Sequence, residues 1–192
     1  MIETGNVVEK ALAFAAVAYS GQSQELSGIP TIIHICESVV LMSGIDPVDR
    51  DLMAAAALWN ITDRTEVTWE EIEETFGTRL KGILQSTHLE TARPEMDPEE
   101  WSAAREAEVA ALKKLPLKLK MVVLAGKLAE VKSLYREYGT YREDLWHRLP
   151  FTDPDRMYQY YYGISDVLQE FEEYAAYTEY NQTVARLFIA HR

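Results

Sequence analysis

The sequence has little cysteine, no long apolar run and few basic residues. Its only cysteine is Cys36, which excludes a disulfide framework or a cysteine-rich zinc module and is typical of a reducing compartment. The longest uncharged apolar stretches, near residues 11–19 and 52–59, are less than half the length that spans a membrane. The first residues, Met1–Gly5, include an acid where a signal peptide would carry bases. We therefore expect a cytoplasmic protein that does not enter a membrane.

Basic residues are outnumbered by acidic ones, with 19 Lys and Arg against 31 Asp and Glu and a formal net charge of −12. Proteins that bind nucleic acid or anionic lipid need a basic surface, which displaces counterions from phosphates. The densest basic stretch, residues 113–120, holds only four lysines and is typical of a solvated helix face. We therefore expect neither nucleic acid nor a membrane as a partner.

The rest of the composition is that of an ordinary globular protein, with 47% hydrophobic and 26% charged residues in a chain of 192. Apolar residues recur every three or four positions, which is typical of amphipathic helices, and two clean stripes run through residues 117–135 and 157–175. No run of alternating β-branched residues indicates a strand. We predict one all-α domain over residues 1–192, a compact bundle of roughly eight to ten helices.

Local signals predict where some of these helices begin and end. Thr68 followed by Glu71 is the pattern of a capping box and predicts a helix start. Asp46, directly before a proline, is predicted to cap the helix that leads to residue 59. Gly44 and Gly139 are predicted to end the helices that precede them.

Five stretches of the sequence carry motifs in a fixed order. They read ALAFAAVAYSGQ at residues 11–22, GIPTIIH at 28–34, AAAALWNITDRT at 54–65 and LKMVVLAGKLAE at 119–130, followed by LW at 145–146 and YYY at 160–162. With their spacing, these stretches resemble the HD-domain metal-dependent phosphohydrolases of the RelA/SpoT type, whose members remove pyrophosphate from (p)ppGpp. The resemblance covers about residues 6–171, leaves 172–192 as a C-terminal helical extension, and implies the all-α HD fold.

In that family two His and two Asp hold a divalent cation, usually Mn²⁺, whose bound water attacks a pyrophosphate phosphorus. By the resemblance, His34 stands at the first ligand position, Trp59 and Asn60 at the His-Asp pair, and Gly126 at the last Asp. An indole and a glycine offer a metal no ligand atom, and an amide oxygen is a weak neutral ligand. The resemblance therefore implies that one of four ligands remains, and we expect no bound Mn²⁺ and no other cofactor.

Other positions of the family pocket have changed as well. Asp63 and Arg64 stand where the family has an acidic pair that helps to activate the water, so one acid is reversed in charge. Glu25 lies in the loop where the family carries bases that grip phosphate, and Thr31 and Glu130 replace a Tyr and an Asn. The vestigial pocket that the resemblance predicts consists of Tyr19, Glu25, Thr31, His34, Trp59, Asn60, Asp63, Arg64, Gly126, Lys127 and Glu130.

Each of these residues also has an ordinary structural explanation. His34 could be a histidine at a helix start that bonds to its neighbours, and Trp59 could fill the space that a metal and its water would leave. The three acids of the vestigial pocket could form a new cation site, could remain solvated, or could be neutralised by Arg64 and Lys127.

Three functions follow from these alternatives. The first is a catalytically degenerate HD-domain protein that binds a small molecule in the old cleft or a protein partner. The second is a working metal-dependent phosphohydrolase that acts on (p)ppGpp or another nucleotide, and the third is a structural subunit of an oligomer. We favour the first over the second because metal catalysis needs three or more good ligands around an open position. The sequence does not rank the first against the third.

A tyrosine cluster at residues 158–162 bears on the question of a partner. Tyr158, Tyr160, Tyr161 and Tyr162 are too close in sequence to share one helical face, so part of the cluster must point outward. Exposed aromatic side chains are enriched at interfaces. We therefore expect this cluster to be a candidate surface for a protein partner or for self-association.

Overall fold

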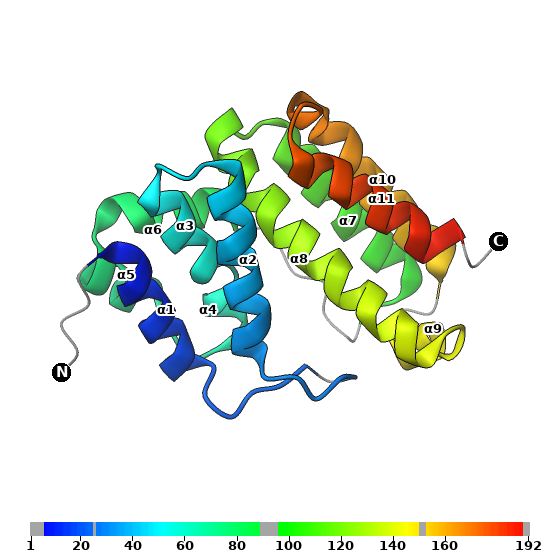
Figure 1. The fold of residues 1–192 in the computed structure, drawn as a ribbon, viewed down its shortest axis with the longest axis horizontal. Helices are drawn as coiled ribbons and strands as arrows, with labels where there is room; N and C mark the ends of the chain where they lie inside the picture. Colours follow the sequence, from blue (N-terminus) through cyan, green and yellow to red (C-terminus); the bar gives the residue numbers. More distant parts are fainter. Residues whose placement is uncertain (1–5, 25, 89–95, 150–152, 190–192) are drawn as a thin grey trace. The chain divides into compact units, whose positions relative to one another are not determined.

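The computed structural model describes residues 6–24, 26–88, 96–149 and 153–189. Its α-helices are α1 (Val7–Ala18), α2 (Thr31–Ile45), α3 (Arg50–Ala57), α4 (Ile61–Arg64), α5 (Trp69–Phe76), α6 (Thr78–Thr87), α7 (Pro98–Lys113), α8 (Leu117–Tyr141), α9 (Asp144–Arg148), α10 (Pro154–Val167) and α11 (Ala175–Ile189) (Figure 1). A 3₁₀ helix, η1, spans Gln169–Phe171. Within the described ranges there is no strand, only an isolated bridge between Ser23 and Pro30. The all-α prediction is confirmed.

The helices group into two compact units. The first unit comprises Met1–His88 and Pro116–Ala129, and the second comprises Leu89–Leu115 and Glu130–Arg192. The long helix α8 therefore contributes its first half to one unit and its second half to the other. A single domain over residues 1–192 stays a prediction.

Helix α3 lies at the centre of the first unit, where it packs against α1, α2 and α6. Its four consecutive alanines, residues 54–57, are all buried, and such small side chains let neighbouring helices approach closely. Leu52 on α3 and Leu124 and Leu128 on α8 add larger buried side chains. This packing fixes the end of α3, from which Trp59 and Asn60 follow.

The helix start predicted at Asp46 is wrong, because that carboxylate is engaged in a local turn. Its Oδ1 accepts hydrogen bonds from the backbone N–H of Val48 at 3.0 Å and of Asp49 at 3.1 Å. Helix α3 begins only at Arg50, and its cap is Asp49, whose Oδ1 accepts from the N–H of Leu52 at 3.4 Å.

Two glycines predicted to end helices lie inside them instead. Gly44 is the second-to-last residue of α2 and Gly139 the third-to-last residue of α8, and neither adopts the left-handed backbone that a terminating glycine uses. The capping box at the start of α5 is confirmed: Thr68 Oγ1 accepts from the N–H of Glu71 at 3.2 Å, and the Glu71 carboxylate accepts from the N–H of Thr68 at 2.9 Å.

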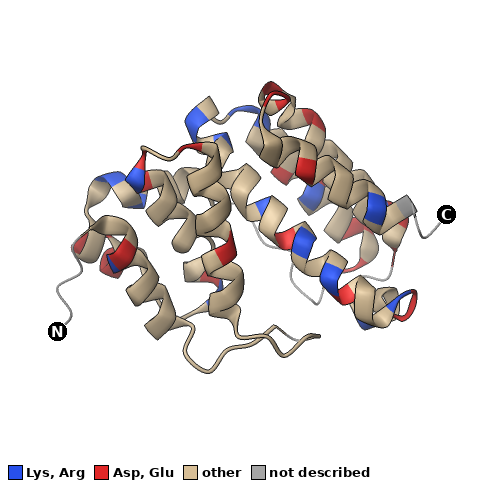
Figure 2. Cartoon of the chain, viewed as in Figure 1, with Lys and Arg blue, Asp and Glu red and all other residues tan. Residues whose placement is uncertain are grey.

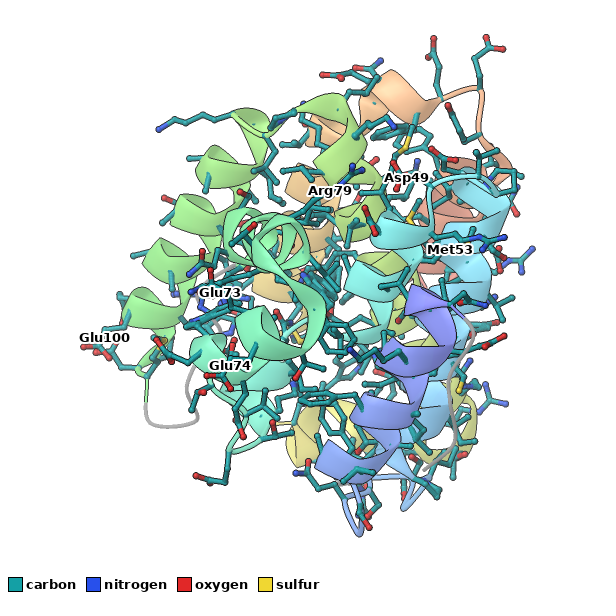
Figure 3. All side chains as sticks on the ribbon, turned by 90° about the vertical axis from the view of Figure 1, so that its left-hand side faces the viewer. Asp49, Met53, Glu73, Glu74, Arg79 and Glu100 are labelled. Carbon is teal, nitrogen blue, oxygen red and sulfur yellow. The ribbon has the colours of Figure 1, made fainter. Side chains whose placement is uncertain are left out.

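Asp49 joins α3 to the start of α8. Its Oδ2 accepts a hydrogen bond from Lys118 Nζ at 3.0 Å, and Arg79 lies at the same end of the first unit (Figure 3). Desolvation alone would raise the pKa of the Asp49 carboxyl, but the hydrogen bonds from Lys118 and from the Leu52 N–H outweigh it and lower the pKa.

This lowered pKa makes a prediction about acid sensitivity. An acid whose pKa is lower in the folded chain stabilises it fully above the unfolded pKa, about 4, and the contribution is lost as the pH falls through the folded pKa. We expect the free energy of unfolding in urea to fall less steeply between pH 6 and pH 3 in Asp49→Asn than in the unsubstituted protein. The exposed Asp166 gives the control Asp166→Asn, which should keep the original slope. Equal slopes for Asp49→Asn and the unsubstituted protein would contradict the role of this carboxylate.

In the second unit α10 packs against both α7 and α11, and Figure 1 shows α10 and α11 running side by side. Phe171 and Tyr180 are fully buried there, and the Tyr180 hydroxyl donates to the carbonyl oxygen of Tyr161 at 2.9 Å. Tyr160 and Tyr161 are buried, whereas Tyr162 is 53% exposed. The prediction that part of the tyrosine cluster points outward is therefore confirmed, and a partner for it stays a prediction.

Charged side chains are distributed over the helices rather than collected into a basic face. Acidic and basic residues are interspersed along the second half of α8 (Figure 2). In the predicted lysine-rich stretch, Lys113, Lys114 and Lys118 are exposed, but Lys120 is buried, so the expected solvated face is wrong for that residue. Among the described helices, none is long and apolar enough to cross a membrane.

Candidate functional site

Trp59 and Asn60 occupy the turn between α3 and α4 in the first unit. Trp59 is only 9% exposed, and its indole N–H donates a hydrogen bond to the carbonyl oxygen of Thr87 at 3.2 Å. This bond anchors the ring against the end of α6. The only nitrogen of the indole is therefore a hydrogen-bond donor already in use.

The Trp59 ring lies directly over Gly126 of α8. A β carbon on residue 126 would stand 2.0 Å from Cζ3 and 2.1 Å from Cε3 of Trp59, far inside van der Waals contact. The indole therefore fills the space into which any side chain at position 126 would project. The next residue, Lys127, is only 4% exposed, and its Nζ lies 5.6 Å from the centroid of the Trp59 ring, within the range of a cation–π interaction.

Asn60 has a left-handed backbone, with φ of 59° and ψ of 19°. This conformation is more accessible to asparagine than to most residues other than glycine. Its side-chain Oδ1 is buried and accepts no hydrogen bond from the described residues. A buried acceptor without a donor costs about 1–3 kcal/mol, so this oxygen is available to a donor group brought by a ligand or by water.

Tyr19, Asp63 and Arg64 are the ionisable side chains at one end of the site. Burial raises the pKa of the Tyr19 hydroxyl to about 12, with Arg64 lowering it and Asp63 raising it further. Burial also raises the pKa of the Asp63 carboxyl. The charge of His88, whose Nε2 lies 3.7 Å from Asp63 Oδ1, and then the charge of Arg64 partly offset this rise. Tyr19 is therefore a neutral hydroxyl at physiological pH.

The loop after α1 is held against this group by backbone contacts. Gln22 Nε2 donates to the carbonyl oxygen of Arg64 at 3.1 Å, and the Thr31 N–H donates to the carbonyl oxygen of Gln22 at 3.0 Å. Thr31 begins α2, and His34 lies in the first turn of that helix with its Nδ1 buried.

The two other predicted acids are Glu25 and Glu130. Glu25 lies outside the described residues. Glu130 belongs to the second unit, where its Oε1 accepts a hydrogen bond from the Tyr161 hydroxyl at 2.7 Å. Of the two bases proposed to neutralise the acids, Arg64 acts on Asp63, whereas Lys127 faces the Trp59 ring.

These side chains do not fit the divalent cation that the HD fold implies. The four positions that the family resemblance assigns to metal ligands hold an imidazole, an indole whose N–H is bonded elsewhere, an amide and no side chain. A divalent metal needs several deprotonated or carboxylate ligands converging on one point. No group of three or more His, Cys, Asp or Glu that could hold a metal is found in the part of the chain that the structure describes. We therefore derive no reaction step through a metal.

Two contacts of the site have no signal in the sequence. His88 lies beside Asp63, 25 positions away, and its ring meets the Trp69 ring edge to face with centroids 5.6 Å apart. Thr87 supplies the acceptor for the Trp59 indole through its backbone, which any residue would provide. Only the fold brings the end of α6 to the turn after α3.

A protein-family model described as an HD domain matches residues 11–147, most of the chain. The chain belongs to the HD-domain family. This confirms the family resemblance found in the sequence. A comparison with curated proteins finds no match.

Solved structures with the same fold include two of similar size. One is described as a metazoan ortholog of SpoT that hydrolyses ppGpp and plays a role in starvation responses; it is 17% identical, with 97% of each chain covered and a TM-score of 0.72. The other is lmo0812 of Listeria monocytogenes, 18% identical, with 81% of this chain and 99% of that chain covered and a TM-score of 0.67. At these identities the likeness establishes the fold, which is that of the RelA/SpoT-type HD domains.

Proposed function

We propose that this HD-domain protein is catalytically degenerate and acts by binding. The observation that carries the proposal is the contact between Trp59 and Gly126. These residues stand where the family has two of its four metal ligands, and the ring of one fills the side-chain space of the other. The two replacements are complementary in shape, as expected of a repacked site and not of a single accidental loss.

The polar groups that remain favour a ligand other than a polyphosphate. Asn60 offers a buried acceptor and Asp63 a carboxylate, both of which attract hydrogen-bond donors or cations. Glu25, in the loop that grips phosphate in the family, adds a negative charge that repels one. The ligand of this site is therefore a neutral or cationic, partly apolar small molecule. Separately, the exposed Tyr162 is the candidate surface for a protein partner.

A working hydrolase is the second candidate, because a protein of the same fold is described as one that hydrolyses ppGpp. Direct measurement separates the two functions. We expect the purified protein to carry no stoichiometric Mn²⁺ or Zn²⁺ by elemental analysis and to gain no melting temperature from either ion. It should bind ppGpp more weakly than about 1 mM at low salt and should not turn it over above background. Turnover that EDTA abolishes would contradict degeneracy, and micromolar binding of ppGpp without turnover would indicate a nucleotide sensor instead.

A restored variant is the positive control for these measurements. Trp59→His, Asn60→Asp and Gly126→Asp together put back the three missing ligands and remove the indole that blocks residue 126. We expect this triple variant to bind Mn²⁺ and to melt at a higher temperature in its presence. Gly126→Asp alone, which leaves Trp59 in place, should not bind the metal. Hydrolysis should return less readily than the metal, since Glu25 and Arg64 remain unchanged.

A further inference from the structure

The second unit contains a cavity of about 360 Å³ between α7 and α10. Two aromatic side chains line it, Trp101 and Tyr160, whose rings meet edge to face with centroids 6.1 Å apart. Val109 and Gly163 line it as well. The volume lies in the range of pockets that hold small organic ligands. None of its lining residues belongs to the vestigial pocket, so this cavity is a site of the second unit alone.

Gly163 keeps part of this cavity open. A β carbon there would lie 3.5 Å from Val109 Cγ2, which is ordinary contact, and the residue has a normal helical backbone. Neither the backbone nor a close neighbour therefore requires glycine at this position. Glycine lowers helix stability by about 1 kcal/mol relative to alanine. The missing side chain leaves room on the face of α10 that meets α7.

The charged residues that line the cavity are mostly cations: Arg105, Lys113 and Arg156 stand against one carboxylate, Glu106. The two arginines are in ion pairs, but the carboxylates that pair with them lie outside the lining. Both arginines are therefore already neutralised, and Arg156 also donates to the carbonyl oxygen of Pro98 at 2.7 Å and to Ser102 Oγ at 2.9 Å. Lys113 is exposed and forms no ion pair with a described residue, so an anion reaches it without displacing a partner.

We infer that the cavity between α7 and α10 binds a small organic monoanion with a flat apolar body. The body lies against the Trp101 and Tyr160 rings and over Gly163, and the anionic group lies within reach of Lys113. Aromatic rings favour a flat ligand through stacked or edge-to-face contacts. Lys113 favours a negative over a neutral head group.

The probe for this site is 1-naphthoate, compared with its uncharged analogue 1-naphthamide by calorimetric titration into the full-length protein at low salt. We expect saturable one-to-one binding of the carboxylate with a dissociation constant of about 1 mM or tighter, as is usual for a ligand of this size. The amide should bind at least about threefold more weakly, because it lacks the charge. Absence of saturation, or equal affinity for the two compounds, would overturn the inference.

Two pairs of variants locate the binding. Lys113→Glu should weaken 1-naphthoate about fivefold to tenfold, whereas Lys114→Glu, the same charge change on the adjacent exposed residue outside the lining, should have little effect. Gly163→Leu should abolish binding by filling the cavity, and Gly139→Leu, at a helical glycine with open space around it, should leave it intact. Thermal melts establish that each variant is folded. Equal weakening by both lysine variants, or undiminished binding to folded Gly163→Leu, would also overturn the inference.

Discussion

Replacing Gly126 by alanine should destabilise the protein by about 2–3 kcal/mol, although the same change usually stabilises a helix interior by up to about 1 kcal/mol. The added methyl group would lie 2.0 Å from the Trp59 ring, so either the ring or α8 must move. The ring has little freedom, because its N–H is bonded to Thr87 and it is almost fully buried. We expect this loss of stability to appear as a lower urea concentration at the midpoint of unfolding.

Gly139 provides the matched control, since it lies on the same helix with nothing within 4 Å of its added β carbon. Gly139→Ala should leave stability unchanged or raise it by up to about 1 kcal/mol. Opposite signs for the same substitution in one helix would isolate the contact with Trp59 from helix propensity. Destabilisation of equal size at both positions would contradict the contact.

A double-mutant cycle tests the pair directly. Trp59→Ala alone should cost about 3–5 kcal/mol, because it empties a large buried volume. In the Trp59→Ala background, Gly126→Ala should no longer destabilise, which gives a coupling energy of about 2–3 kcal/mol between the two positions. Additive costs would mean that the indole does not constrain residue 126.

Much of the fold could be predicted from the sequence because the signals involved are local. The apolar spacing of α8 and α10, and the capping box of α5, depend on residues three or four positions apart. The prediction of a helix start at Asp46 is wrong for a local reason as well. A second aspartate, Asp49, lies three residues later and caps α3 instead. The Asp46 carboxylate does not cap the helix because it already accepts hydrogen bonds within its own turn.

The site could be predicted only as a set of positions. The family resemblance placed Trp59 and Gly126 in one pocket, but it did not indicate that the ring covers the glycine. Charge alone did not indicate that Asp63 would lie beside His88. Such contacts join residues far apart in the sequence, and their geometry depends on packing that no local pattern encodes.

A buried polar cluster in the second unit could not be predicted from the sequence for the same reason. Arg105 and Glu108, three residues apart on α7, are only 9% and 4% exposed. They form an ion pair of 2.5 Å, and the Tyr160 hydroxyl of α10 donates to Glu108 at 2.6 Å. Burial, and then the Glu108 charge, raise the pKa of Tyr160 well above its ordinary value. The tyrosine therefore stays a hydrogen-bond donor throughout the physiological pH range.

Removing Arg105 alone should cost far more than replacing all three members of this cluster. Arg105→Met leaves the Glu108 carboxylate buried without its cation and should destabilise the protein by about 3–5 kcal/mol at pH 7. Tyr160→Phe removes one donor to that carboxylate and should cost about 1–3 kcal/mol. The combination of Arg105→Met, Glu108→Leu and Tyr160→Phe replaces the cluster with apolar groups and should recover most of the loss, as measured by urea unfolding.

The pH dependence of the stability of Arg105→Met distinguishes the cost of an unpaired buried charge from the cost of lost packing. Without the arginine, the Glu108 carboxylate is a buried charge without its cation, and adding a proton removes that charge, so proton binding favours the folded variant over its unfolded chain. Its stability relative to the unsubstituted protein should therefore improve as the pH falls from 7 toward 4, and the deficit should return as the pH rises. Arg105→Met combined with Glu108→Gln, which carries no charge to strand, is the control and should show no such trend. A deficit in Arg105→Met that stays constant from pH 7 to pH 4 would mean that the arginine contributes packing alone.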